Sequence, residues 1–550
     1  MGQLSRLDFL VFIGYFLIIS FYGLWIYNKK KSAVSSSKDY FLAEGSLTWW
    51  AIGASLIASN ISAEQFIGMS GSGFQMGLAI ASYEWVAAAT LLIVAVFFIP
   101  VYLKNKIYTM PQFLNQRYNS TVSKIMAVFW LLLYVVVNLT SILYLGALAI
   151  SSISGLDVTL CMYGLALFAV VITLGGMKVI GYTDVIQVFF LIAGGLVTTY
   201  IALEMVSDHF NGNGILDGFT LLQKNAPEHF QMIFHKDDPN YMDLPGLSVL
   251  LGGMWVSNLS YWGCNQYITQ RALGADLPTA RKGLLFAAFL KIFMPVIVVL
   301  PGIAAFVLYK EGVFQQEMLN NGVLEVDRAY PAILNFLPTG LKGLSFAALT
   351  AAIVASLAGK ANSIATIFTL DIYTGAKNNE AKKVKVGKIT VVVAMFIAIL
   401  IAPMLGIDKK GGFQYIQEYT GFFSPGILAM FLLGFFWKRS TSAAAIFATI
   451  GGFAFSVILK FLPNIMDLSF LYPIGFSKAN VDGVYEIPFL DRMGIVFMMC
   501  LIGMYFISIF SPPSKKGLDI DAGMFRVSSS FLAGSLLVLG ILAALYTIYY

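Results

Sequence analysis

Apolar stretches of roughly 20 residues recur along the whole chain, and each is long enough to cross a lipid bilayer as a helix. Short segments rich in Lys and Arg separate many of them. Of the 550 residues, 58% are hydrophobic and 12% are charged, which is about half the charged fraction of an ordinary soluble domain. A bilayer core offers no water to the backbone, so apolar spans must be helices or a closed barrel. The sequence therefore predicts an all-α polytopic membrane protein.

The lengths of these stretches predict about fourteen transmembrane helices. An even number of spans places both chain ends on one side of the membrane. Basic residues gather in the odd-numbered loops, and basic loops stay in the cytoplasm. We therefore expect a multi-pass protein of the plasma membrane with both termini extracytoplasmic. The expected helices are 8–27, 47–70, 76–103, 122–150, 157–175, 182–206, 244–268, 282–309, 343–372, 387–405, 413–437, 441–461, 490–511 and 529–550.

Two of the expected helices have polar centres. Residues 60–65 read NISAEQ, and residues 254–271 read MWVSNLSYWGCNQYITQR. Each polar centre lies in the first helix of a group of five, and an odd number of helices inverts the second group relative to the first. Interrupted spans at matching positions of two inverted halves indicate a transporter's binding site near the bilayer midplane. We expect the two interrupted centres, around Gln65 and Asn258, to converge on one polar solute. The alternative is that these amides and hydroxyls only hydrogen-bond between packed helices.

This count divides the chain into five parts. A first helix and a basic cytoplasmic loop precede two five-helix repeats, an extracytoplasmic loop separates the repeats, and three more helices follow. We expect the helices to break near 57–68 in the first repeat and near 254–267 in the second. The predicted boundaries are 1–46, 47–206, 207–243, 244–437 and 438–550.

The few ionisable residues inside the expected spans are candidates for function. Lys291 and Lys360 lie deep within apolar segments, as do Glu64, Glu84 and Asp184. A buried ammonium needs a partner, a cavity or the loss of its proton, so these lysines require an explanation.

The histidines argue against redox or metal chemistry in the membrane. His209, His229 and His235 all lie in the hydrophilic stretch 207–243. A membrane enzyme with haem or a bundle-buried metal would usually need histidines inside its spans. We therefore expect that the chain is not an enzyme.

Several long motifs follow one another along the chain. They are ASLIASNISAEQFIG (54–68), ASYEW (81–85), GGMKVIGYTDVIQ (175–187), NLSYWGCNQYITQR (258–271), AAFLK (287–291), NSIATIFTLDIY (362–373) and FQYIQEYTG (413–421). In this order they resemble the sodium/solute symporters, and within that family the sodium/galactose and sodium/glucose transporters most closely. The resemblance covers essentially the whole chain. It implies a LeuT-like fold with an inverted five-plus-five repeat, and transport by alternating access.

The resemblance also implies a sugar site. Amides and a carboxylate exchange hydrogen bonds with hydroxyl groups, and an aromatic ring covers the apolar face of a sugar. The ring that stacks on the sugar and closes its inner side matches Tyr261, with Trp262 beside it. Lys291 would donate to a sugar hydroxyl or pair with Glu84, unless that pair only holds helices together. The side chains that match the family's sugar contacts are Gln65, Glu84, Asn258, Lys291 and Gln417.

A sodium ion is the co-transported ligand that the family implies. Its carbonyl ligands match Ala58, Ile61 and Ala352, and its two hydroxyl positions match Ala355 and Ser356. Carbonyl oxygens freed where a helix unwinds suit a hard cation. Ala355 departs from the pattern because it has no side-chain oxygen.

Two further charged residues belong to the expected ion path. Asp184 matches a family acid near the sodium exit, and Lys360 lies one turn after Ser356 on about the same helix face. We expect the Lys360 ammonium to pair with Asp184 or to lie near the cation site, where it would replace the charge of sodium. Alternatively, Lys360 extends its charge out of the membrane from a helix end.

Sodium-coupled uptake of a hexose such as galactose or glucose is the function that the sequence favours. A proton-coupled or uniporting sugar carrier is the first alternative, because of Ala355 and Lys360. A second is a sodium symporter of a polyol, sialic acid or an amino acid, and a solute-sensing membrane domain is a third. The expected partners are a sugar, sodium and the lipid bilayer, and no nucleic acid.

Overall fold

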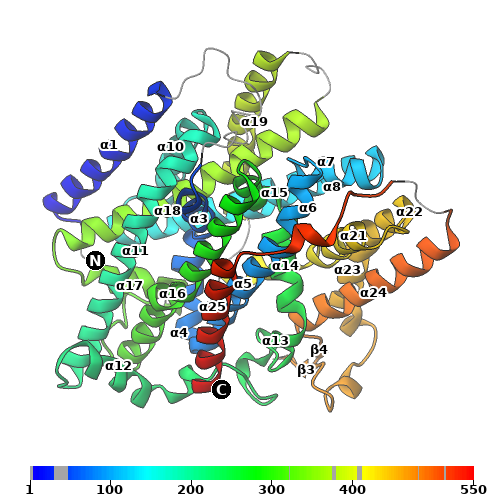
Figure 1. Cartoon of the computed structure of the whole chain (residues 1–550). Coiled ribbons are helices and arrows are strands. Elements are labelled where there is room, and N and C mark those ends of the chain that lie inside the picture. Colours follow the sequence, from blue (N-terminus) through cyan, green and yellow to red (C-terminus); the bar gives the residue numbers. More distant parts are fainter. Residues whose placement is uncertain are drawn as a thin grey trace.

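The computed structural model describes residues 4–29, 47–320, 322–373, 379–404, 412–480, 482–512 and 516–550, and most of these are helical. Most of the predicted basic loop after the first helix lies outside the described residues. Within them, ten helices are long and apolar enough to cross a membrane. The number is eleven when the helix pair Phe413–Gly421 and Ser424–Phe436, bent by 51°, counts as one span. The chain is thus a mostly helical polytopic membrane protein (Figure 1).

The main helices follow the predicted apolar stretches, with several divided into shorter pieces. Two antiparallel hairpins, β1 (Leu319–Asn320) with β2 (Val323–Leu324) and β3 (Lys478–Ala479) with β4 (Tyr485–Glu486), lie in the connections. The helices are α1 (Arg6–Lys29), α3 (Trp49–Asn60), α4 (Ser70–Met76), α5 (Ser82–Ile93), α6 (Ile99–Lys104), α7 (Met110–Arg117), α8 (Ser120–Leu132), α9 (Thr140–Ser154), α10 (Val158–Thr173), α11 (Gly176–His209), α12 (Gly214–Asn225), α13 (Ser248–Leu251), α14 (Gly253–Cys264), α15 (Gln266–Leu273), α16 (Leu277–Lys310), α17 (Ala329–Asn335), α18 (Leu341–Ile367), α19 (Glu380–Ile401), α20 (Gly412–Gly421), α21 (Ser424–Phe436), α22 (Ser442–Ile446), α23 (Gly452–Phe461), α24 (Phe489–Phe510) and α25 (Ser529–Ile548).

Two helices, α16 and α18, form the centre of the bundle. Helix α16 packs against α3, α4, α5 and α11, and α18 packs against α1, α3, α9, α10 and α11. The sequence of α18 is rich in Ala, Ser and Gly, and small side chains let membrane helices approach closely. Nearly every residue of α18 is buried as a result. Any charged side chain that α18 carries in its middle must therefore face protein or a cavity.

The first interrupted helix breaks after α3. Helix α3 ends at Asn60, and Ile61 is extended with φ −79° and ψ 114°. Helical structure resumes in the π-helical segment η1 (Glu64–Met69) and continues into α4. Ser62 replaces the lost helical hydrogen bonds: its N–H donates to Gln65 Oε1 at 3.0 Å, and its Oγ accepts from the Glu64 N–H at 3.1 Å. The polar residues of the NISAEQ sequence thus satisfy the broken backbone themselves.

The second interrupted helix breaks at Asn265, between α14 and α15. Asn265 is extended with φ −101° and ψ 121°, and its Oδ1 accepts from the Tyr267 N–H at 3.1 Å. An asparagine in this position caps the following helix and satisfies a freed N–H group. The expectation that Asn258 lies in an unwound centre is wrong. Asn258 is inside α14 and donates to the Met254 carbonyl at 3.0 Å, because residues before Asn265 keep their helical bonds.

The predicted extracytoplasmic loop, 207–243, folds into α12 and two short 3-10 turns and packs against the first broken helix. In η5 (Pro227–Phe230), His229 Nε2 lies 3.0 Å from the Phe74 carbonyl oxygen, and its ring stacks on Phe306 at 3.9 Å. Burial lowers the pKa of His229, because it disfavours the charged imidazolium form. The imidazole is therefore neutral near pH 7, and its Nε2–H donates to the end of α4.

Candidate functional site

A cavity lies beside both helix breaks. The centre of a water molecule can occupy about 80 Å³ of it, and its volume is about 870 Å³ when all the space open to the outside is included. Segment η1 and helices α5, α14, α16 and α20 all contribute side chains to its wall. The structure brings together all seven residues predicted for sugar contact, which are Gln65, Glu84, Asn258, Tyr261, Trp262, Lys291 and Gln417.

A buried ion pair forms one wall of this cavity. Lys291 Nζ of α16 lies 2.5 Å from Glu84 Oε2 of α5, with the two side chains 1% and 4% exposed. The same ammonium donates to Asn60 Oδ1 at the end of α3 and stands 5.2 Å from the centre of the Trp262 ring. A buried charge is stable when it is paired and its remaining protons are hydrogen-bonded. Lys291 was predicted either to donate to a sugar hydroxyl or to pair with Glu84. In the structure it pairs with Glu84.

Tyr261 connects the two interrupted helices. Its hydroxyl accepts a hydrogen bond from Asn60 Nδ2 at 3.2 Å, and its ring meets Trp262 edge-on at 5.2 Å. Asn60 thus bonds to both Tyr261 and Lys291, although sequence reasoning did not place it among the site residues. The signal was available, because an asparagine at the break of an apolar helix must find polar partners inside the protein.

The three amide side chains have different surroundings. Gln65 Oε1 accepts a hydrogen bond from the Ser62 N–H, and Asn258 Nδ2 donates one to the Met254 carbonyl. Gln417 reaches the cavity from α20, which packs against η1. A cavity with amides, one carboxylate and aromatic rings can hold an uncharged ligand with several hydroxyl groups.

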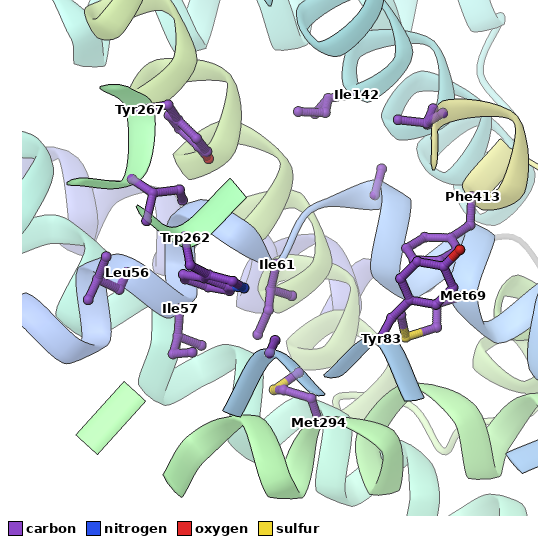
Figure 2. Packing of buried hydrophobic residues seen from close by; sticks show 14 of the residues in the cluster. Leu56, Ile57, Ile61, Met69, Tyr83, Ile142, Trp262, Tyr267, Met294 and Phe413 are labelled. Carbon is purple, nitrogen blue, oxygen red and sulfur yellow. The ribbon is translucent and has the colours of Figure 1, made fainter. Parts of the chain in front are cut away.

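Beside the cavity, α20 meets both the first broken helix and α5. Phe413 and Tyr83, both lining residues, pack edge-to-face at 5.0 Å (Figure 2). The approach is close because Gly68 has no side chain: a Cβ there would lie 2.8 Å from the Phe413 nitrogen and 2.9 Å from its Cβ.

We expect Gly68→Ala to slow transport. The added methyl group would push α20 away from η1 at a contact far shorter than ordinary van der Waals distance. Initial uptake rates in proteoliposomes should fall severalfold, and the matched variant Gly164→Ala, whose Cβ meets nothing within 4 Å, should transport normally. Equal rates for the two variants would show that this contact does not limit transport.

A second polar group of contacts joins α18 to the end of α3. Ser356 Oγ donates to the Ser59 carbonyl at 2.7 Å and lies 3.2 Å from the Tyr267 hydroxyl. The expected sodium ligands Ala58 and Ile61 lie one residue before and two residues after Ser59 on the broken helix. The last carbonyls of a helix have no intrahelical partner, so oxygen ligands are available here.

The other predicted sodium positions lie on α18. Ala352 and Ala355 are buried on the same helix as Ser356. Ala355 has no side-chain oxygen. Among the five predicted sodium positions, Ser356 is therefore the one that can offer sodium a side-chain oxygen.

Asp184 and Lys360 do not pair with one another. Asp184 Oδ2 accepts from Ser55 Oγ at 2.5 Å and lies 4.0 Å from an Arg271 guanidinium nitrogen, while Arg271 Nε donates to Ser55 Oγ at 3.0 Å. The predicted Asp184–Lys360 pair is therefore wrong, because α3 and α15 supply the partners of the acid.

Lys360 points inward instead of out of the membrane. It is 3% exposed, lines the cavity, and its Nζ lies 5.1 Å from the centre of the Tyr267 ring. The alternative of a charge extended from a helix end is also wrong, because this part of α18 is enclosed by other helices. Lys360 is one helical turn from Ser356. That its ammonium lies near a bound cation stays a prediction.

The fold and this cavity are those of a secondary transporter with interrupted helices. The structure is similar to that of a Na⁺-coupled sialic acid symporter in a substrate-bound outward-open state, with a TM-score of 0.74, 23% identity, and coverage of 93% of this chain and 99% of that one. It is also similar to a nucleobase-cation-symport-1 family transporter in a closed conformation, with a TM-score of 0.52, 13% identity, and coverage of 92% and 99%. These likenesses concern the fold.

Sequence relatives identify the family. The profile of the sodium:solute symporter family matches residues 40–452. The chain is 46% identical to a sodium/glucose cotransporter of Vibrio parahaemolyticus, over 100% of this chain and 99% of the relative. It is 33% identical to human sodium/myo-inositol cotransporter 2, over 92% of this chain and 77% of the relative. The chain belongs to the sodium:solute symporter family. It is a sodium-coupled membrane transporter, and its relatives are transporters and not enzymes.

Proposed function

We propose that this protein couples the inward movement of sodium to the uptake of a hexose, such as glucose or galactose. The observation that carries the proposal is the single cavity shared by Glu84, Lys291, Gln417 and Tyr261. Its polar groups match the hydroxyls of a sugar, and its rings match the apolar face. The 46% identity to a sodium/glucose cotransporter over the full length supports the same solute class.

The proposed mechanism uses the predicted sodium positions on the broken helix and on α18. Sodium at Ala58, Ile61, Ala352 and Ser356 would hold α18 against the end of α3 and thereby fix the wall that carries Asn60. A cation that stabilises the sugar-binding arrangement raises sugar affinity, and the sugar raises sodium affinity by the same factor. Each sodium that crosses the full membrane potential contributes about 2.3 kcal/mol per 100 mV.

The proposal includes a fourteen-helix arrangement in two inverted repeats, 47–206 and 244–437, with 1–46 before them, 207–243 between them and 438–550 after them. Ten long apolar helices support most of it. The four further spans would begin with α3, whose broken continuation α4 lies within the long apolar helix Glu64–Lys104. The other three would be the broken segment α14–α15, the 16-residue α10, and the bent pair α20–α21. Both termini would then be extracytoplasmic, and the protein would lie in the plasma membrane.

Uptake into proteoliposomes tests the proposal. Initial uptake of labelled galactose, glucose and myo-inositol is measured with an inward sodium gradient and again with choline in place of sodium. The proposal predicts saturable, sodium-dependent uptake of at least one hexose. Uptake that is unchanged in choline would contradict sodium coupling, and sodium-dependent uptake of another solute without any hexose would contradict the sugar assignment.

A polyol is the second candidate solute. The chain is 33% identical to human sodium/myo-inositol cotransporter 2. Inositol also presents a ring of hydroxyl groups, so the same amides and carboxylate would bind it. Preference of inositol over both hexoses in the same panel would favour this candidate.

A further inference from the structure

The side-chain nitrogen of Lys360 lies beside the proposed sodium site, and its ring contact is with Tyr267. Lys360 Nζ stands over the ring of Tyr267, 5.1 Å from its centre, and the Tyr267 hydroxyl lies 3.2 Å from Ser356 Oγ. Ser356 and Lys360 are one turn apart on α18. One tyrosine therefore contacts both the proposed sodium ligand and the ammonium.

The nearby negative charge only partly offsets the positive charge of the Lys360 ammonium. Among the described residues, no carboxylate lies within ion-pair distance of Lys360, and the acid that acts on it electrostatically is Glu64 on η1. Glu64 also lines the cavity, and its Oε1 accepts from Ser141 at 3.0 Å. The other charges near Tyr267 are Arg271, 5.1 Å from its ring centre, and Asp184, which Ser55 and Arg271 engage.

A fixed ammonium and a bound sodium ion repel one another. Two unit charges about 10 Å apart at an effective dielectric constant near 20 change each other's binding constant by roughly tenfold. The missing oxygen at Ala355 acts in the same direction, because fewer oxygen ligands hold a hard cation less tightly. Both features weaken the same site.

We propose that Lys360 sets the sodium affinity of this transporter by placing a fixed positive charge one helical turn from the sodium ligand Ser356. This inference rests on the proposed sodium-coupled sugar uptake, and it adds what determines how tightly sodium binds. The protein would then require a high external sodium concentration for uptake, and a neutral side chain at this position would lower that requirement.

A charge series at position 360 tests the proposal. Lys360→Met keeps an unbranched chain of similar length without charge, and Lys360→Gln is a second neutral variant in case methionine disturbs folding. Lys360→Arg keeps the charge. The sodium concentration for half-maximal galactose uptake is measured in proteoliposomes, with choline used to hold the ionic strength constant, and the maximal rate is recorded separately. Size-exclusion profiles report on folding.

The expected result is a roughly tenfold lower half-saturating sodium concentration for the methionine and glutamine variants, with arginine close to the wild type. Equal sodium requirements for wild type and both neutral variants would overturn the inference and leave sodium-coupled uptake standing. Uptake independent of sodium in every variant would contradict the proposed function and the inference together.

Discussion

Neutralising either member of the Glu84–Lys291 pair should abolish saturable sugar uptake and also destabilise the protein. Both side chains are almost fully buried, and their charged atoms lie 2.5 Å apart. Removing one partner leaves an uncompensated buried charge, which costs about 3–5 kcal/mol. Glu84→Gln and Lys291→Met should therefore each show a lower unfolding temperature in detergent and no uptake above control liposomes.

The double variant Glu84→Gln/Lys291→Met separates the two effects. It removes both charges, so folding stability should return most of the way to that of the wild type. Uptake should remain absent because the carboxylate and ammonium proposed to contact the sugar are gone. A stable double variant that transports at the wild-type rate would show that the pair holds helices together and does not bind sugar.

Ser356→Ala should sharply raise the sodium concentration that uptake requires. With Ala355 already lacking a hydroxyl, this change leaves the proposed sodium site with carbonyl oxygens alone. A polar contact to a charged group contributes roughly 1.5–3 kcal/mol, so sodium affinity should fall about 10- to 100-fold. The half-saturating sodium concentration for galactose uptake measures this directly.

Ala355→Ser is the matched opposite change. It introduces a hydroxyl at the position where the family's second side-chain ligand is expected, and it should tighten sodium binding by up to about tenfold.

The Ser356 hydroxyl also bonds to the Ser59 carbonyl, so a purely structural role of Ser356 would weaken transport at every sodium concentration. A lower maximal rate for Ser356→Ala with an unaltered sodium requirement would contradict its assignment as a ligand.

The class of fold and many of the cavity residues could be predicted from the sequence. Apolar length and basic loops predict helical spans because the bilayer leaves few other ways to satisfy the backbone. The break after α3 could be anticipated because NISAEQ supplies its own replacement bonds, from Ser62 to Gln65 and Glu64. Residues as far apart in sequence as Glu84 and Gln417 were assigned through motifs shared with a family, which spacing alone cannot supply.

The remaining details depend on tertiary contacts. The second break lies at Asn265, several residues beyond the expected Asn258, because the Asn265 side chain caps α15. The partner of Asp184 could not be read from helical periodicity, since Ser55 and Arg271 reach it from two other helices. Asn60 was missed for a related reason: its importance comes from bonding Tyr261 and Lys291 at once, which needs three elements to meet.

The dependence of sugar affinity on sodium is the most direct test of the account as a whole. The dissociation constant of galactose or glucose is measured on the purified protein with sodium and with choline, for the wild type and Gln417→Ala. We expect clearly tighter sugar binding with sodium in the wild type, and weak binding in both ions for the variant. A wild-type dissociation constant that is the same in sodium and choline, or normal sugar binding by Gln417→Ala, would contradict a sodium-linked sugar site between the two broken helices.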